Sequence, residues 1–193
     1  DKFNFNGVYL DANETISSNF SDIYFSELEL KPYSIFTSMK LSDGYSMKTD
    51  LIYPKGFGSS MNYELYLKSR HHFSSDISDF RDFNQFLISH LRSYSSVNLL
   101  TTFTGIKNEA RFISVADGQT TFEESENSNL SGPLTISEPS SYEKLFMFTV
   151  MNNSLPGIPM IYYGEEFGHI GEKGYDSQRD MKFQTSLNVI ESY

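Results

Sequence analysis

The sequence predicts an α/β fold in which helices cover a parallel sheet, and two neighbouring segments carry most of this prediction. Residues 158–163 (IPMIYY) form a short apolar run between a Pro-Gly pair and a glycine, which is typical of a strand buried on both faces. Residues 141–153 before it are apolar nearly all round, which indicates a buried helix. Ser140 and Glu143 fit a capping box at the start of this helix. Helix, turn and strand together make one step of a layered α/β protein.

Further strands and helices follow the same alternation, and we assign residues 1–193 to a single domain. Runs rich in β-branched and aromatic residues predict strands, and apolar residues at helical spacing predict a helix. The elements expected in chain order are strand 3–11, strand 34–41, helix 79–92, strand 97–104, a polar loop 113–140, helix 141–153 and strand 158–163. Residues 61–67 (MNYELYL) add a weaker strand that leads into a helix.

The composition argues against several classes of function. The net charge of −10 at pH 7 argues against nucleic acid and an anionic membrane as partners. No segment approaches the roughly 20 apolar residues of a membrane span, and the lack of cysteine excludes disulfides and thiolate metal sites. His71 and His72 diverge in direction on either a strand or a helix, so we expect these two and His90 on the surface. We expect no metal and no cofactor, and the compartment stays open.

The predicted strand 158–163 also carries a resemblance to a known family. The pattern G-x-P-x-x-Y-x-G-x-E is reproduced by Gly157, Pro159, Tyr162, Gly164 and Glu166. A similar continuation follows, with Asp176, Arg179 and Met181. The stretch resembles the end of the eighth barrel strand in the α-amylase family, glycoside hydrolase family 13. Asp180 stands where that family usually has a proline.

The resemblance implies a more specific fold class, the second half (strands 4–8) of a (β/α)₈ TIM barrel. Residues 6–11 (NGVYLD) are similar to the family's fourth-strand motif, and residues 103–112 to the motif after its seventh strand. A whole barrel takes about 250 residues. We therefore expect a fragment of a longer chain that lacks the N-terminal half of the barrel, or a half completed by a partner copy, as in a homodimer. Either arrangement would cover the edges at 3–11 and 158–163.

The resemblance places the family's three catalytic carboxylates, of which one is kept. Asp11 takes the position of the nucleophile, although a strand-end residue that caps the next helix is an equally good interpretation. Ser38 takes the position of the acid/base glutamate and Asn108 that of the transition-state aspartate, so both carboxylates are lost. Retaining glycosidases need two carboxyl groups about 5–5.5 Å apart, and serine cannot act as the acid. We therefore expect a catalytically impaired domain.

Five further positions are expected to bind substrate by the same resemblance: Tyr9, Lys107, Arg111, Tyr163 and Glu166. Tyr9 replaces an arginine that pairs with the family's nucleophile, and Lys107 replaces a histidine that donates to sugar hydroxyls. The implied ligand is an α-glucan or a maltooligosaccharide.

Three functions stay open at this point. The first is a degenerate amylase-like domain that binds carbohydrate or a protein without hydrolysis. The second is an active α-glucan hydrolase whose acid comes from another position, such as Asp43 or Glu109. The third is a non-enzymatic interaction scaffold with no sugar site.

Overall fold

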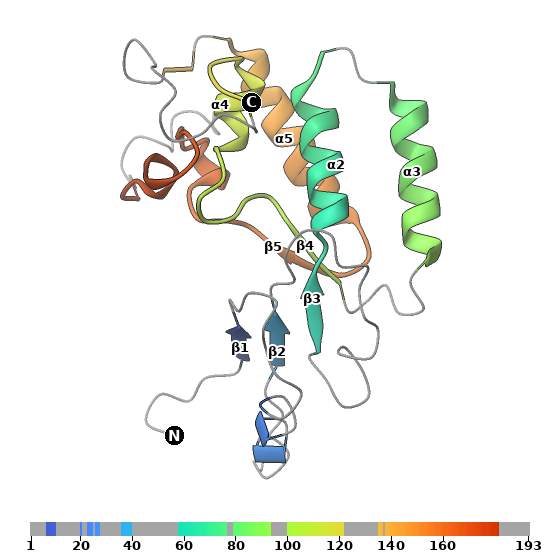
Figure 1. Ribbon diagram of the computed structural model, residues 1–193. Coiled ribbons are helices and arrows are strands. Elements are labelled where there is room, and N and C mark those ends of the chain that lie inside the picture. The colour runs from blue at the N-terminus through green and yellow to red at the C-terminus, as the bar shows by residue number, and fades with distance from the viewer. Residues whose placement is uncertain are drawn as a thin grey trace. The chain divides into compact units, whose positions relative to one another are not determined.

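The computed structural model describes residues 7–10, 20, 23–24, 26–27, 36–39, 58–76, 79–93, 100–121, 135–136 and 138–181. The elements follow in the order β1 (Gly7–Leu10), β2 (Phe36–Met39), β3 (Ser59–Met61), α2 (Tyr63–Ser74), α3 (Phe80–Ser93), β4 (Leu100–Phe103), α4 (Phe112–Ala116), α5 (Ser140–Ser154), β5 (Ile158–Met160), and the 3₁₀ helices η3 (Glu165–Phe167) and η4 (Tyr175–Gln178) (Figure 1). Within the described ranges, no helix combines the length and the hydropathy needed to cross a membrane.

Five parallel strands form one sheet in the sequential order β1-β2-β3-β4-β5. Along β1 and β2 the pairing runs from Gly7 opposite Phe36 to Leu10 opposite Met39. β2 pairs with β3, and β3 pairs with β4, in the same parallel sense. Helices connect β3 to β4 and β4 to β5, as parallel pairing requires. The predicted α/β class is confirmed, and the consecutive strand order is that of a partial (β/α)₈ barrel.

The chain groups into two compact units, and the assignment of residues 1–193 to a single domain stays a prediction. Unit 1 holds residues 1–63, 94–101 and 156–158, and unit 2 holds residues 64–93, 102–155 and 159–193. The boundaries fall within β4 and β5. Unit 1 therefore contains β1 to β3, and unit 2 contains the helices α3 to α5, nearly all of α2, and the segments that follow β4 and β5.

β5 is shorter and more exposed than the sequence predicts. The strand ends at Met160 rather than at residue 163, and Pro159 in its middle is exposed. β5 stands last in the strand order, and proline is tolerated on such an edge because it has no N–H to donate. The prediction of a strand buried on both faces is therefore wrong. The aromatic half of the apolar run leaves the strand and leads into η3.

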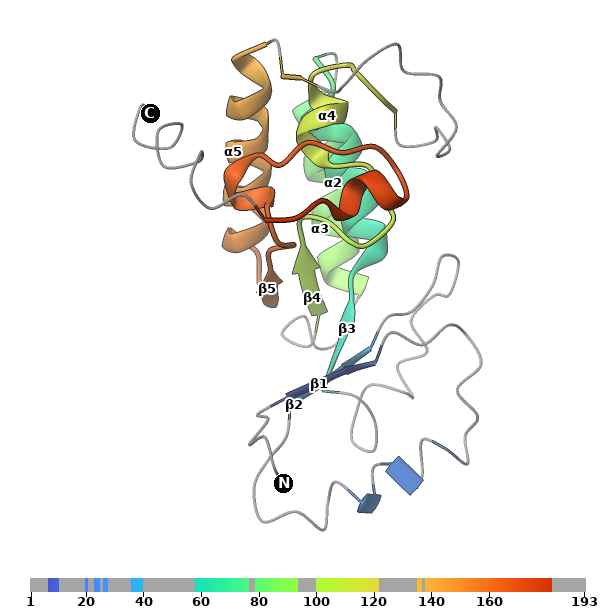
Figure 2. The same cartoon turned by 90° about the vertical axis from the view of Figure 1, so that its left-hand side faces the viewer.

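The predicted loop 113–140 begins with a helix instead. α4 occupies Phe112–Ala116, and its residues Phe112 and Ile113 are fully buried. α4 and α5 lie side by side in both views (Figures 1 and 2), and the ring of Phe112 stacks on that of Phe148 with centroids 4.4 Å apart. Five residues are too few to show a helical period in the sequence. The helix exists because its apolar residues have a partner on α5.

α5 spans the predicted helix, but its start and its burial differ from the prediction. Pro139 is the N-cap and no side chain caps the helix, so the capping box of Ser140 and Glu143 is wrong. Phe148 is buried, whereas Phe146 is 69% exposed. α5 therefore buries one face only, although its sequence is apolar on most sides.

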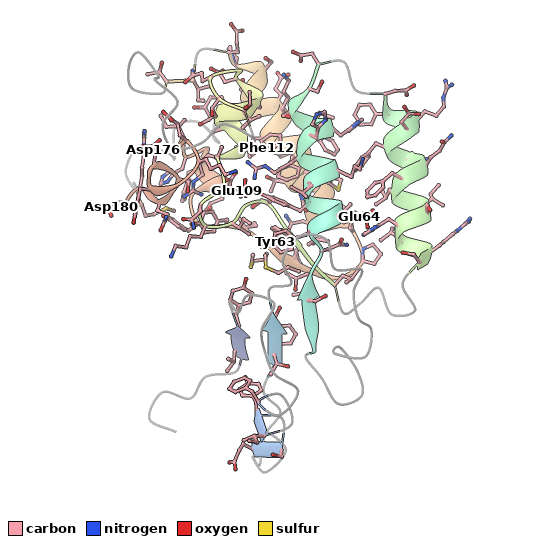
Figure 3. The ribbon with its side chains drawn as sticks, in the orientation of Figure 1. Tyr63, Glu64, Glu109, Phe112, Asp176 and Asp180 are labelled. Carbon is pink, nitrogen blue, oxygen red and sulfur yellow. The ribbon has the colours of Figure 1, made fainter. Side chains whose placement is uncertain are left out.

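Two of the histidines expected on the surface lie in an aromatic cluster between α2 and α3. His72 on α2 is buried, and its ring stacks on Phe83 of α3 at 4.5 Å between centroids and meets Phe80 edge-on at 4.6 Å. His90 on α3 is also buried, and its Nδ1 lies 3.1 Å from Oε2 of Glu64 at the start of α2 (Figure 3). The expectation of surface positions is wrong for both, because helix packing supplies partners that the sequence does not show.

This cluster makes the packing of α2 against α3 sensitive to acid. Burial is the largest cause that lowers the pKa of His72 and His90 below 6.5; Asp79 and Glu64 act in the opposite direction, and His71 lowers the pKa of His72 further. A histidine whose pKa is lowered by folding contributes stability that is present above pH 6.5 and is lost as the pH falls below that value.

We predict that His72→Phe makes the free energy of unfolding less sensitive to acid, because phenylalanine keeps the ring contacts and takes up no proton. Urea unfolding at neutral pH and at about pH 5 measures this. His71→Phe, at the exposed neighbouring position, is the matched control and should keep most of the sensitivity of the wild type, since His71 is the smallest of the three causes that shift the pKa of His72. Equal acid sensitivity of His72→Phe and the wild type would contradict the prediction.

Candidate functional site

Tyr9 on β1 and Ser38 on β2 are neighbours in the sheet of unit 1. They are register partners, so their side chains leave the same face of the sheet. Ser38 is 6% exposed, while Tyr9 is exposed and its hydroxyl donates to Sδ of Met61 on β3 at 3.0 Å. Beyond them, Ser59 Oγ and Thr101 Oγ1 share a hydrogen bond of 2.6 Å. Hydroxyl groups and a thioether therefore line this part of the sheet.

No aspartate or glutamate lies within the bounds of any of the five described strands. Asp11 follows β1 directly, but it lies outside the described residues, as does Asp43. Their proposed roles as nucleophile and as relocated acid stay predictions. Ser38 is thus the described group at the position where the resemblance requires an acid.

Asn108 and Lys107 lie in the turn after β4, in unit 2, and both are exposed. Asn108 has a φ of 70°, the one positive value among the described non-glycine residues, and asparagine adopts such values more readily than most residues. Its carbonyl oxygen accepts a hydrogen bond from the N–H of Gly174 at 3.0 Å, and its Oδ1 accepts one from Nε2 of Gln178 at 2.8 Å. Asn108 therefore holds the segment after β5 in place, and its assignment to the position of a catalytic aspartate stays a prediction.

Arg111 is buried and its guanidinium contacts protein groups. Its side chain is 1% exposed, and Nη1 donates to the carbonyl of Tyr163 at 2.7 Å and lies 3.7 Å from Oε1 of Glu165. The guanidinium carbon lies 4.5 Å from the centre of the Tyr162 ring and 4.7 Å from that of Tyr163. These contacts join the segment after β4 to the segment after β5. The role of Arg111 in binding substrate stays a prediction, and the contacts found give it a structural role.

A second buried arginine comes from α2. Arg70 donates to the hydroxyl of Tyr66 and to the carbonyl of Ala110, and its Nη1 lies 4.0 Å from Oε2 of Glu109, which Figure 3 labels. With Arg111 and Glu165 it forms a group of two guanidinium and two carboxylate side chains. Sequence reasoning missed Arg70, because one arginine within a helix looks the same whether it faces solvent or the interior.

Glu165 is the one buried acid among the described residues. It is 2% exposed, and burial raises its pKa to about 7, although Arg111 and Arg70 act in the opposite direction. Sequence reasoning selected the exposed Glu166 and missed Glu165, because two adjacent glutamates give no signal of which one turns inward. A glycine directly after a β-rich run, Gly105, could have indicated that another group approaches the backbone closely there. The structure shows this group to be Glu165, because a Cβ on Gly105 would lie 3.0 Å from Oε1 of Glu165.

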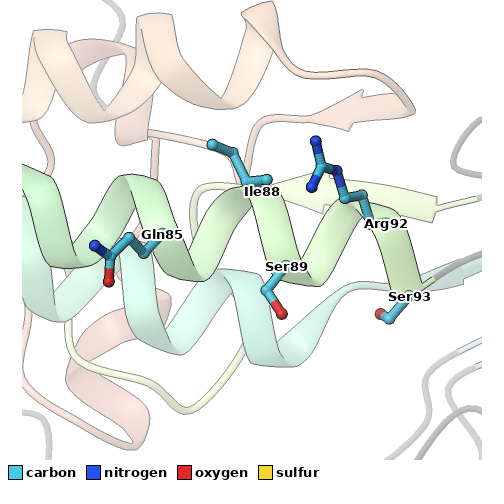
Figure 4. A pocket seen from close by; sticks show the side chains of 5 residues that line it. All are labelled: Gln85, Ile88, Ser89, Arg92 and Ser93. Carbon is cyan, nitrogen blue, oxygen red and sulfur yellow. The ribbon is translucent and has the colours of Figure 1, made fainter.

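A shallow hollow of about 500 Å³ lies on α3, lined by Gln85, Ile88, Ser89, Arg92 and Ser93 (Figure 4). All five residues belong to one helix, and none of the predicted site residues is among them, so we do not place the site there. The described ranges also contain no group of three or more His, Cys, Asp or Glu side chains that could hold a metal ion. In unit 2, the predicted residues that remain exposed to a ligand are Lys107, Asn108, Tyr163 and Glu166.

We predict that ionisation of Glu165 lowers the free energy of unfolding of the protein as the pH rises. Its pKa is raised from 4.5 to about 7 in the folded state, so the contribution is most favourable below pH 4.5 and falls as the pH rises towards 7. Glu165→Gln has no proton to lose, so its free energy of unfolding should gain on that of the wild type across this interval. Chemical denaturation over a pH series measures the difference.

Glu166→Gln is the matched control, since it makes the same chemical change at an exposed neighbour. It should track the wild type over the whole series. The prediction fails if Glu165→Gln and Glu166→Gln show the same dependence on pH.

Comparison with known proteins identifies the fold. No protein-family model matches the sequence, and no curated protein does. Solved structures match over 96% of the chain: an α-amylase from Anoxybacillus (TM-score 0.74, 20% identity), an α-amylase from Geobacillus thermoleovorans in complex with acarbose (0.73, 19%), and the ligand-free cyclic α-maltosyl-(1→6)-maltose hydrolase from Arthrobacter globiformis (0.66, 15%). This chain spans 37%, 38% and 38% of their respective lengths. The resemblance found in the sequence is thus confirmed for the fold: the chain has the fold of an α-amylase barrel, over the part of that barrel which it spans.

Proposed function

We propose that this chain is an α-amylase-type domain of α-glucan metabolism that binds α-glucans or maltooligosaccharides and hydrolyses them poorly or not at all. Its ancestry in the α-amylase family is part of this proposal. The fold supports it, together with the motif residues around β5. The enzymes of similar fold include an α-amylase solved with acarbose and a cyclic α-maltosyl-(1→6)-maltose hydrolase solved with maltose.

The observation that carries the proposal is the side chain of Ser38. It is a buried hydroxyl on β2, beside Tyr9, at the position where the resemblance requires the acid/base glutamate. A general acid must have a pKa that can be brought near the working pH, and an alkyl hydroxyl does not meet this condition. Loss of one member of a catalytic group typically lowers the rate by several powers of ten.

Asn108 supports the same conclusion from unit 2. An amide has the shape of the aspartate that it replaces by the resemblance, but it carries no negative charge to stabilise an oxocarbenium-like transition state. Its Oδ1 already accepts a hydrogen bond from Gln178. Ser38 and Asn108 therefore cannot supply the two carboxylates that the resemblance places at their positions.

The capacity to bind sugar rests on exposed aromatic and polar groups. Tyr9 on β1 and Tyr163 after β5 are both exposed, and Lys107 and Asn108 are exposed polar groups in the turn after β4. A tyrosine ring offers an apolar face to the C–H groups of a sugar. The hydroxyls of Tyr9 and Tyr163 donate to Met61 and to the carbonyl of Arg179, and their oxygens can still accept a hydrogen bond. These residues are proposed contacts, each within its own unit.

An active hydrolase with a relocated acid is the second candidate. Glu109 is half-buried, and its Oε2 lies 4.0 Å from Nη1 of Arg70. This contact engages the Glu109 carboxylate with a buried arginine of α2, so it favours the impaired domain over Glu109 as the acid.

We predict that the wild-type chain binds maltoheptaose in calorimetry and releases reducing ends at the rate of a buffer control. Asp11→Asn should leave the reducing-end rate unchanged, because the nucleophile position has no acid partner. A rate above background that Asp11→Asn abolishes would establish the active hydrolase instead. Absence of both binding and hydrolysis would favour the interaction scaffold.

We further propose that other strands cover the two ends of the sheet, supplied by a second copy or by more of a barrel. β1 and β5 stand at the ends of the described strand order, and open strand edges invite pairing with other chains. Sedimentation of the 193-residue chain should show a dimer if a second copy covers the edge, and amide exchange at Gly7–Leu10 should then be slow. A monomer with fast exchange in β1 contradicts cover by a second copy.

A further inference from the structure

Tyr175 differs from every other tyrosine that the structure describes. It is 85% exposed, and its side chain makes no hydrogen bond or ring contact with a described residue. The remaining described tyrosines all have partners: Tyr9, Tyr24, Tyr63, Tyr66, Tyr142, Tyr162 and Tyr163. An isolated exposed aromatic residue needs no explanation by itself. The loop around Tyr175 supplies the reason to consider it further.

The segment that presents Tyr175 is fixed by bonds within itself. Arg179 donates from Nε and Nη2 to the two carboxylate oxygens of Asp176 at 2.8 and 2.9 Å, and Asp176 Oδ2 also accepts the N–H of Glu172 at 2.8 Å. Ser177 is buried, and its hydroxyl donates to the carbonyl of Gly174 at 2.7 Å. Figure 3 labels Asp176 in this segment. The 3₁₀ helix η4, which starts at Tyr175, therefore has a defined conformation.

The same segment is also fixed to the rest of unit 2. The N–H of Gly174 donates to the carbonyl of Asn108 at 3.0 Å, and the N–H of Arg111 donates to the carbonyl of Gly171 at 2.9 Å. The hydroxyl of Tyr163 donates to the carbonyl of Arg179 at 3.2 Å. Backbone groups of the segment are thus bonded to other parts of unit 2, while the ring of Tyr175 is directed to solvent.

An amide pair lies on the same side of η4 as the tyrosine. Gln178 is three residues after Tyr175 in a 3₁₀ helix, and side chains at this spacing are eclipsed on one face. Nε2 of Gln178 donates to Oδ1 of Asn108 at 2.8 Å. Each amide keeps a further hydrogen-bonding atom, one as a donor and one as an acceptor.

We propose that Tyr175, with Gln178 and Asn108 beside it, is a saccharide-binding platform of the domain. The apolar face of one pyranose ring of an α-glucan stacks on the tyrosine ring, and neighbouring sugar hydroxyls bond to the two amides. This inference rests on the proposed function, because it assigns the α-glucan to particular residues. The platform is preformed, so binding does not have to order the loop.

The test uses the whole 193-residue chain, with maltoheptaose as the probe in isothermal calorimetry. Tyr175→Ala should weaken binding about tenfold through loss of the aromatic contact. Phe146→Ala is the matched control, since it removes another exposed aromatic ring of unit 2, 69% exposed on α5, and it should bind as the wild type does. Far-UV circular dichroism checks that both variants are folded.

Tyr175→Trp gives a second and direct readout. The chain contains no tryptophan, so this variant carries a single indole at the platform. Its affinity should stay near that of the wild type, and its emission should shift as maltoheptaose is added. If the wild type binds but Tyr175→Ala binds equally well and the indole emission does not change, the platform is refuted and the proposed function stands. If the wild type does not bind, both fail.

Discussion

The buried guanidinium of Arg111 is the constraint on which the arrangement of the loops in unit 2 depends. It joins the end of β4 to the end of β5 through a carbonyl, a carboxylate and two aromatic rings. A buried charge is tolerated only with such partners, and removal of one partner is costly because the other charge is left unpaired. The path of the chain around it leaves little freedom: Gly164 has a φ of 86°, and a Cβ there would lie 2.4 Å from Nδ1 of His169.

The residues that match the α-amylase family divide by their physical role. Arg111, Phe112 and Gly164 keep the family pattern, and the structure shows them buried or held at a positive φ. Ser38 and Asn108 depart from it, by the resemblance, at positions where the family pattern specifies chemistry. Packing and backbone geometry therefore account for Arg111, Phe112 and Gly164, and such constraints act on a fold whether or not it catalyses a reaction.

The sequence predicted those features that are decided locally. β4 and the region of β5 could be expected as strands because they are compact β-rich or apolar runs, and helix 79–92 matches α3 within one residue at each end. Helix α4 could not be predicted, because its formation depends on contact with Phe148, far away in the chain. The burial of His72 and Glu165 could not be predicted either, since an inward direction is set by partners on other elements and not by the residue's own neighbours.

Ser38 and Asn108, the two positions where the resemblance expects a catalytic carboxylate, differ in how readily a carboxylate side chain would fit. Asn108 is exposed in a turn, and an aspartate has the same shape and could accept the same hydrogen bond from Gln178. Ser38 is 6% exposed within the sheet of unit 1. A glutamate there would need room for two methylene groups and a carboxylate, and overpacking alone costs about 1–3 kcal/mol, to which desolvation of the charge adds. A carboxylate in place of Asn108 would change the charge and could keep the hydrogen bond, whereas one in place of Ser38 would meet the packed surroundings of a buried side chain. Under the proposed function, the position of Ser38 rather than that of Asn108 therefore limits any gain of hydrolysis by substitution.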